Sequence, residues 1–166
     1  MSFIETKPEL LTDNPFKLIG ADWMLITAGT AESFNTMTAS WGGLGVLWDR
    51  KVALCFIRPS RYTFGFVENA QKFTLSFFEE KHRQALSFCG THSGRDIDKV
   101  KETGLTPIKE PGLIYFAEAR LVLACRKLYY QDVVPANFLE SKINDMYAKK
   151  DYHRMYVGEI VKCLTK

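Results

Sequence analysis

The order of its predicted elements constrains the fold of this chain more than any other feature of the sequence. Short apolar or alternating segments predict strands, and longer amphipathic segments predict helices. The strands are expected over 23–30, 36–41, 52–57, 72–78, 117–131 and 153–164, and the helices over 61–70, 80–89 and 96–103. Because strands and helices do not alternate regularly, a doubly wound parallel sheet is not expected. The order predicts a mainly β fold, a mostly antiparallel barrel with peripheral helices.

Residue types at the segment ends set the expected helix boundaries. Ser60 predicts the N-cap of the first helix, Asp96 predicts the N-cap of the third, and Gly104 ends that third helix. Residues 1–15 predict a loose lead-in, and residues 135–150 predict a connection that contains a helical turn.

Composition limits the number of domains and the location. The chain has 166 residues, 46% hydrophobic and 25% charged, and no repeat or linker divides it, so residues 1–166 are expected to form a single domain. The net charge of +3 is spread over the chain and does not favour a nucleic-acid partner. The longest apolar runs, such as 52–57, are too short to span a bilayer, and the N-terminus lacks a signal-peptide pattern. We therefore expect a cytoplasmic protein with no membrane partner.

The four cysteines, Cys55, Cys89, Cys125 and Cys163, lie far apart in the sequence, and three of them are in strand-like runs. This distribution favours buried thiols over a zinc site. Cys89, near the end of a predicted helix, is expected to be the most reachable of the four.

Three segments concentrate small hydroxyl residues, glycine and arginine. The first contains Asn35, Thr36, Met37, Thr38, Ala39, Ser40 and Trp41 and runs into Gly42 and Gly43. Its small side chains would let a flat ligand approach the backbone and pair with free N–H and C=O groups. An ordinary strand that ends in a glycine turn is the simpler interpretation of this segment alone.

The second segment contains Arg58, Pro59, Ser60, Arg61, Tyr62 and Thr63 at a predicted strand-to-helix junction. A helix start offers unpaired N–H groups and a partial positive charge, so arginines and hydroxyls beside it suit a phosphate. A capped helix with two solvated arginines explains the pattern equally well.

The third segment, Ser93, Gly94, Arg95, Asp96, Ile97, Asp98 and Lys99, again precedes a helix. Arg95 and Lys99 can reach an anion there, and Asp98 can orient one of them. A polar loop before a capped helix is the simpler interpretation of this segment by itself.

The sequence carries no signature of catalysis by side chains alone. We find no G-x-G-x-x-G after a strand, no P-loop, no carboxylate dyad and no Ser-His-Asp or Cys-His pattern. His153 starts the last predicted strand, a position typical of a hydrogen-bonded structural histidine. If the protein is an enzyme, a cofactor is expected to supply the reactive group.

Taken together, these segments and Val157-Gly158-Glu159-Ile160 resemble the flavin reductase-like family of FMN-binding split barrels, over the chain from about Pro15 onward. The flavoredoxin-type branch and its ferric or flavin reductase relatives are the most similar. The resemblance implies an FMN-binding split β-barrel, a six-stranded antiparallel Greek-key barrel with outer helices. It also implies a homodimer with FMN near the interface.

Carried onto this sequence, the resemblance assigns Thr38, Ala39 and Ser40 to the isoalloxazine ring through their backbone. Ser60, Arg61 and Thr63 would hold the phosphate end with Arg58 nearby, and Arg95 and Lys99 would add charge. The cofactor-binding set that follows is Asn35, Thr36, Met37, Thr38, Ala39, Ser40, Trp41, Arg58, Ser60, Arg61, Tyr62, Thr63, Ser93, Gly94, Arg95, Asp98 and Lys99, with His153 as the catalytic candidate beside the flavin edge.

One stretch departs from the family pattern. Related flavin reductases often carry Gly-Asp-His before the last strand, whereas this chain has Asp151-Tyr152-His153. This departure leaves direct use of NAD(P)H open. The resemblance implies an FMN-dependent oxidoreductase that takes electrons from NAD(P)H or a protein donor and passes them to free flavin, a ferric chelate or another acceptor. A flavoredoxin-like electron carrier without a nicotinamide site and a non-catalytic flavin-binding module are the alternatives.

Overall fold

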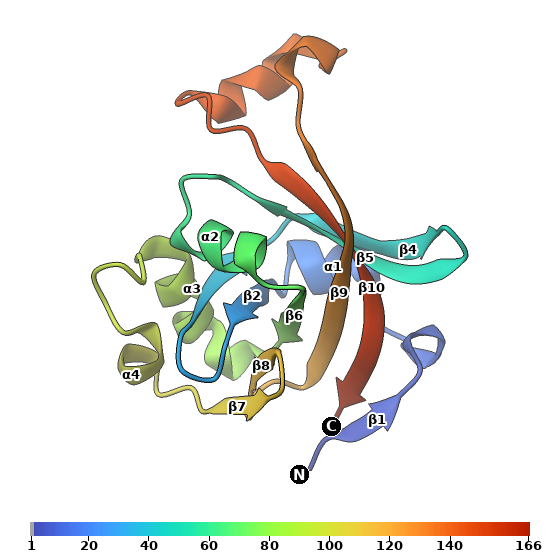
Figure 1. Cartoon of the computed structure of the whole chain (residues 1–166), viewed down its shortest axis with the longest axis vertical. Coiled ribbons are helices and arrows are strands. Elements are labelled where there is room, and N and C mark those ends of the chain that lie inside the picture. The colour runs from blue at the N-terminus through green and yellow to red at the C-terminus, as the bar shows by residue number, and fades with distance from the viewer. Residues whose placement is uncertain (1) are drawn as a thin grey trace.

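The computed structural model describes residues 2–166 and is built on one antiparallel sheet of eight strands (Figure 1). Seven strands follow one another in the order β3 (Phe34–Ala39), β2 (Met24–Gly29), β6 (Lys72–Phe77), β9 (Leu121–Asp132), β10 (Arg154–Thr165), β5 (Arg50–Ile57) and β4 (Gly42–Leu47). The eighth strand, β1 (Ile4–Thr6), pairs with β10, while β7 (Pro107–Glu110) and β8 (Leu113–Phe116) form a separate ribbon.

The sheet curves into a barrel that does not close. β3 and β4 are consecutive in the chain, yet they lie at the two ends of the strand order. Only Ser40 and Trp41 connect them. The split of the barrel therefore falls between these two strands, and no strand within residues 2–166 pairs with the outer edge of β3.

Helices pack against both faces of the sheet beside this split. They are α1 (Pro15–Gly20), α2 (Tyr62–Asn69), α3 (Arg83–Thr91) and α4 (Lys99–Thr103), with short 3-10 turns η1 (Pro8–Leu10) and η2 (Glu80–His82). α2 and α3 both pack on β2 and β3 (Figure 1). The two helices thus flank the strand whose outer edge is open.

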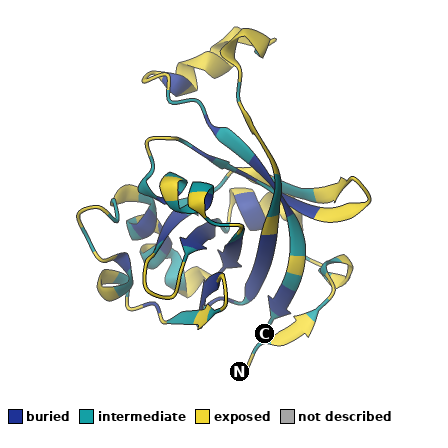
Figure 2. Cartoon of the chain, viewed as in Figure 1, coloured by how far each residue is buried: buried dark blue, intermediate teal, exposed yellow. Residues whose placement is uncertain are grey.

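Alternation along the strands separates two hydrophobic clusters. Ile26 packs inside the barrel with Phe73 and Tyr156, whereas Leu25 packs on the other face with Leu86 of α3 and Phe116. Successive side chains of a strand point to opposite faces, so adjacent residues of β2 serve both clusters. Burial is concentrated in the sheet and on the inner faces of the helices (Figure 2).

β9 and β10 extend beyond the barrel and carry an arm, which we define as residues 133–152. It contains the 3-10 helices η3 (Pro135–Asn137) and η4 (Ser141–Tyr147) and projects from one end of the molecule (Figure 1). Most of the arm is exposed, but Tyr147 is buried (Figure 2). The arm therefore meets the body of the protein near Tyr147.

The mainly β, split-barrel fold class is confirmed, as are all six predicted strands and the three predicted helices, within a few residues at each end. The sheet nevertheless holds eight strands rather than six, since β1 and β4 were not predicted. Residues 1–15 are more ordered than a loose lead-in, because they contain β1 and η1 and begin α1.

Both predicted N-caps are wrong. The N-cap of α2 is Arg61 rather than Ser60, whose hydroxyl donates to Asp151 Oδ2 at 3.0 Å instead. The N-cap of α4 is Asp98 rather than Asp96, and its carboxylate accepts from Lys101 N at 3.1 Å. Gly104 ends α4 as predicted, with a φ of 69°.

All four cysteines are buried, which confirms the prediction of enclosed thiols. Cys89 is no more reachable than the others, however. It lies on the buried face of α3 and is fully enclosed in the hydrophobic cluster that contains Leu25 and Leu86. Burial raises the pKa of its thiol to about 11. No helix within residues 2–166 is both long and apolar enough to cross a membrane.

Candidate functional site

The outer edge of β3 forms the first part of the site. The carbonyl oxygen of Thr36 points away from β2, since it accepts a hydrogen bond from Lys99 Nζ at 2.8 Å. Backbone groups of successive residues in an antiparallel strand face opposite edges, so Thr38, two residues further on, faces the same outer edge. The end of β3 therefore presents backbone donors and acceptors at the split of the barrel.

A pocket of about 210 Å³ lies at this point. It brings together residues 37–41 of the first predicted segment, Arg58 and Arg61 of the second segment, and His153. Its lining residues are Met37, Thr38, Ala39, Ser40, Trp41, Phe56, Arg58, Arg61 and His153. Asn35 and Thr36 lie outside this pocket, because Asn35 Nδ2 donates to Thr63 Oγ1 at 2.8 Å and both side chains are buried.

Arg61 is held at the C-terminal end of α3. Its guanidinium donates to the carbonyl oxygens of Gly90, at 3.1 Å, and Cys89, at 3.4 Å. These carbonyls carry the negative end of the helix dipole, which suits a cation. Burial lowers the pKa of the Arg61 guanidinium, but a guanidinium keeps its charge in proteins. Two of its five N–H donors are used in this way, so others can serve a ligand.

Arg58 and Ser60 are bound to the arm. Arg58 donates to Asp151 Oδ1 at 2.8 Å and to the carbonyl oxygen of Met146 at 2.9 Å, and its guanidinium lies 4.7 Å from the centre of the Tyr147 ring. Ser60 contacts the other carboxylate oxygen of Asp151. The two residues therefore fasten the arm to the body of the protein beside the pocket.

The third segment packs against the first two at Gly94. A Cβ at this position would lie 2.1 Å from Asn35 Oδ1 and 3.1 Å from Tyr62, so only glycine fits without a shift. This contact places Arg95 beside α2, where its guanidinium lies 4.9 Å from the centre of the Tyr62 ring. Arg95 itself is exposed.

Lys99 does not reach into open space. Its side chain is buried and donates to the carbonyl oxygens of Thr36 and Cys89, at 2.8 and 2.9 Å, so it links β3 to α3. Burial lowers the pKa of Lys99 to about 8. Asp98 caps α4 and forms no hydrogen bond or ion pair with Arg95 or Lys99 in the part of the chain that the structure describes.

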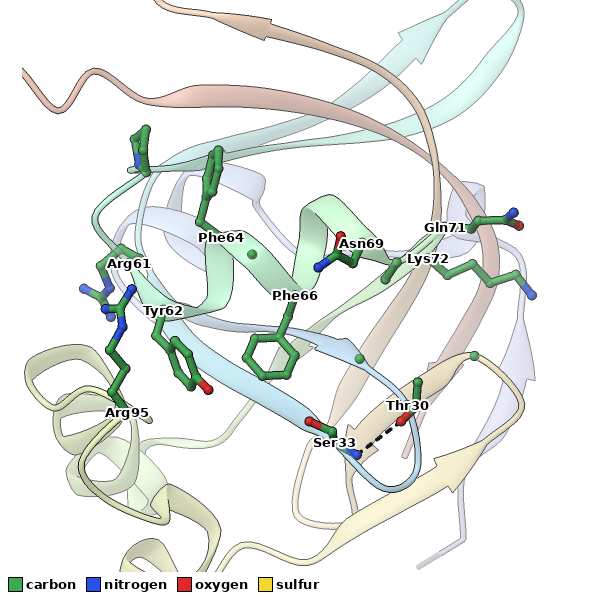
Figure 3. Close-up of a pocket in the computed structure, with 15 residues that line it drawn as sticks. Thr30, Ser33, Arg61, Tyr62, Phe64, Phe66, Asn69, Gln71, Lys72 and Arg95 are labelled. Carbon is green, nitrogen blue, oxygen red and sulfur yellow. Dashed lines mark hydrogen bonds between the residues drawn. The ribbon is translucent and has the colours of Figure 1, made fainter.

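A larger groove of about 830 Å³ adjoins the pocket at Arg61 (Figure 3). Arg61, Tyr62 and Arg95 line one end of it, and Figure 3 shows both arginine side chains at that end, beside the ring of Tyr62. Phe66 lies further along the groove, toward Ser33. Ser40, Arg61 and Arg95, from three distant segments, thus lie along two adjoining hollows.

His153 lies immediately before β10 and is buried. Its Nδ1 lies 2.8 Å from the hydroxyl oxygen of Tyr147, and its ring centre lies 5.1 Å from that of Trp41. Burial, reinforced by the charge of Arg58, lowers the pKa of His153 to about 4. The imidazole is therefore neutral at neutral pH.

Four residues that form or support the site were not among the predicted site residues: Phe56, Gly90, Tyr147 and Asp151. Phe56 lies in an apolar run and Gly90 at a helix end, which are unremarkable positions for a sequence. Tyr147 belongs to the predicted connection 135–150, and Asp151 was noted only as part of the stretch that departs from the family pattern. Their roles arise from contacts between distant parts of the chain.

The fold and the site together define a split β-barrel protein with a hollow suited to a flat, negatively charged ligand. The family model described as "Flavin reductase like domain" matches residues 17–166. The chain therefore belongs to the flavin reductase-like family.

Solved structures share the fold at low sequence identity. An FMN-binding domain of a flavin reductases-like enzyme from Shewanella baltica is 16% identical with a TM-score of 0.71, covering 99% of this chain and 77% of that one. Flavoredoxin of Desulfovibrio vulgaris is 18% identical with a TM-score of 0.68, covering 98% and 77%. The NADH:FAD oxidoreductase of Streptomyces globisporus is 16% identical with a TM-score of 0.66, covering 87% and 75%. A search of the curated proteins finds no match.

Proposed function

We propose that the protein is an FMN-dependent oxidoreductase, which passes electrons from a reduced nicotinamide or a protein donor to free flavin, a ferric chelate or another acceptor. One observation carries this proposal: the end of β3 and Arg61 line one pocket, and that pocket adjoins a groove lined by Arg95. FMN combines a flat ring that has polar edges with a phosphate tail. It therefore needs both backbone groups and cations along one path.

The residues present fit such a ligand. Backbone groups of Thr38 and Ser40, which face the outer edge, would pair with the ring edge, whereas the backbone of Ala39 faces β2, contrary to the role that the resemblance implies. A second hollow of about 460 Å³ adjoins the pocket at Ser40, Trp41 and Phe56, so a ring wider than the pocket has room. The phosphate would bind Arg61 and Arg95, which both line the adjoining groove. Each hydrogen bond of this kind, to a charged group, is worth about 1.5–3 kcal/mol.

In this proposal Arg58, Ser60, Thr63 and Lys99 support the site rather than contact the phosphate. Each already has partners within the protein. This differs from the roles that the family resemblance implies for them.

FMN, when bound, supplies the hydride or single-electron transfer. The chain orients the ring through the β3 backbone, and Trp41 and Phe56 shield it from water. Arg61 places a fixed positive charge beside the pocket, which stabilises negative charge on a reduced ligand. His153, neutral and enclosed, acts by hydrogen bonding rather than as a charged acid.

An anaerobic titration tests the proposal. We expect the purified protein to be yellow, or to become so with added FMN, and to bleach when NADH or NADPH is added without oxygen. Retained colour would favour the electron-carrier or the non-catalytic flavin-binding alternative, which the changed Asp151-Tyr152-His153 stretch keeps open. A colourless protein that fails to bind FMN would refute all three functions.

We further propose a cytoplasmic homodimer with FMN near the subunit interface. Trp41 remains 42% exposed at the edge of the pocket, which suits coverage by a second subunit. Analytical ultracentrifugation of the FMN-loaded protein tests the assembly, and a monomer at micromolar concentration would contradict it.

A further inference from the structure

The arm places a buried tyrosine directly behind His153. The Tyr147 hydroxyl lies 2.8 Å from His153 Nδ1, and Tyr147 is only 7% exposed. The two rings meet edge to face, with centres 5.4 Å apart and planes at 81°. Tyr147 therefore lies on the side of the imidazole that the ligand pocket does not use.

The direction of this hydrogen bond follows from the surroundings. Burial raises the pKa of Tyr147, so its hydroxyl keeps its proton. Among residues 2–166, Nδ1 of His153 is the only partner recorded for that hydroxyl. A phenol that donates to Nδ1 leaves the proton of the neutral imidazole on Nε2.

Nε2 is the atom left to act on a ligand. Within the described residues it has no hydrogen-bond partner, and it is not among the buried unpaired atoms, so it keeps access to solvent. His153 itself lines the pocket at the end of β3, with Trp41 and Phe56 against its ring.

Two charged groups face the His153–Tyr147 pair. Arg58 lies over the Tyr147 ring, and its charge opposes protonation of His153, whereas Asp151 favours it. The two side chains form an ion pair with each other at 2.8 Å, so Asp151 counteracts part of the effect of Arg58 on the imidazole. Burial is then the main cause that keeps His153 neutral.

We propose that Tyr147 is a positioning residue, which holds neutral His153 with its Nε2–H available to the pocket, where it donates a hydrogen bond to a carbonyl oxygen or an unprotonated ring nitrogen of the flat ligand. The identity of the ligand rests on the proposed function, but the protonation state of His153 does not. The arm thereby takes part in recognition, although none of its residues, 133–152, lines the pocket.

Nitrogen-15 NMR of the ligand-free protein tests the tautomer directly. We expect the imidazole signals of His153 to show a protonated Nε2 and an unprotonated Nδ1, without titration between about pH 5.5 and 8. In Tyr147→Phe, which removes only the hydroxyl, we expect mixed tautomers and a pKa that rises toward the ordinary value of about 6.5, because the neutral form loses its hydrogen bond.

Tyr152→Phe is the matched control. Tyr152 packs 4.8 Å from Tyr147, centre to centre, but its hydroxyl donates to Asn144 rather than to His153. We expect its His153 signals to match those of the wild-type protein. A wild-type His153 protonated at Nδ1, or a Tyr147→Phe spectrum identical to the wild type, would overturn the proposal.

Binding of FMN to the apoprotein gives the second readout. The phosphate of FMN titrates near pH 6, so this group gives both proteins the same pH dependence. Between about pH 8 and 5.5 we expect the affinity of Tyr147→Phe to change several-fold beyond that of the wild type, as His153 gains a proton. An equal pH profile in the two proteins would overturn the role in recognition. Failure of both proteins to bind FMN at any pH would overturn the proposed function, while the NMR result would still decide the role of Tyr147.

Discussion

Gly94 offers the sharpest test of how the three segments are held together. In Gly94→Ala the new methyl carbon would lie 2.1 Å from Asn35 Oδ1, so the Asn35 side chain must move. Asn35 is buried and would lose its 2.8 Å hydrogen bond to Thr63 Oγ1. Leaving a buried polar group unpaired costs about 1–3 kcal/mol, and the reduced freedom of the unfolded chain returns about 0.4–1 kcal/mol.

We therefore expect Gly94→Ala to lower the free energy of unfolding by about 1–2 kcal/mol, measured by urea denaturation followed through tryptophan fluorescence. Gly65→Ala is the matched control, because a Cβ there meets nothing within 4 Å and Gly65 lies inside α2. It should stabilise the protein by about 0.5–1 kcal/mol.

A double-mutant cycle locates the cause of the loss. In an Asn35→Ala background the 2.1 Å clash is gone and only the 3.1 Å contact with Tyr62 remains, so Gly94→Ala should destabilise the protein much less. A Gly94→Ala protein as stable as the wild type, or an equal loss in the Asn35→Ala background, would show that the segments are not fastened at this contact.

Four further outcomes are expected. Arg61→Ala should weaken FMN binding to the apoprotein about 10- to 150-fold, given a charged hydrogen bond of about 1.5–3 kcal/mol, and unchanged affinity would remove Arg61 from the phosphate site. A thiol reagent should leave Cys89 unmodified under native conditions, since it is enclosed, and rapid labelling found by mass spectrometry would contradict its burial. His153 has a pKa of about 4 in the folded protein, below its unfolded value, so the free energy of unfolding should fall as pH falls from about 6.5 to 4. This loss is at most about 3 kcal/mol and should be absent in His153→Gln. Lys99 has a pKa of about 8, below its unfolded value, so the free energy of unfolding of the wild type relative to Lys99→Met should rise from about pH 8 to 10.5. If the difference between the two proteins does not change with pH, Lys99 is not buried as a charged group.

The barrel was predictable because its strands have strong local patterns. Runs such as 52–57 and 72–78 are apolar or alternating, and each became a strand of the sheet. β4 escaped because its sequence contains Gly42, Gly43 and Gly45, which have little preference for strands, and it forms by pairing with β5. Strand pairing between segments is not visible in local composition.

The segments that form the site were predictable, but which of their charged side chains remain available to a ligand was not. Arg58, Arg61 and Lys99 look alike in the sequence as cations near helix starts. In the fold Arg58 is paired with Asp151, 93 positions further on, and Lys99 is buried between β3 and α3. Which cation keeps free donors depends on long-range contacts, and the sequence offers no local signal for them.

The bond from Lys99 to Thr36 also bears on how this chain avoids the addition of foreign strands to its sheet. An edge strand with unpaired backbone groups invites strands from other molecules to add to the sheet. Along β3, the Lys99 ammonium occupies one outward carbonyl, and the Thr38 hydroxyl donates to the carbonyl of Leu86, which holds α3 against the strand. An incoming strand would have to displace both, so the outer edge of β3 is blocked around Thr36, while backbone groups stay accessible from Thr38 to Ser40.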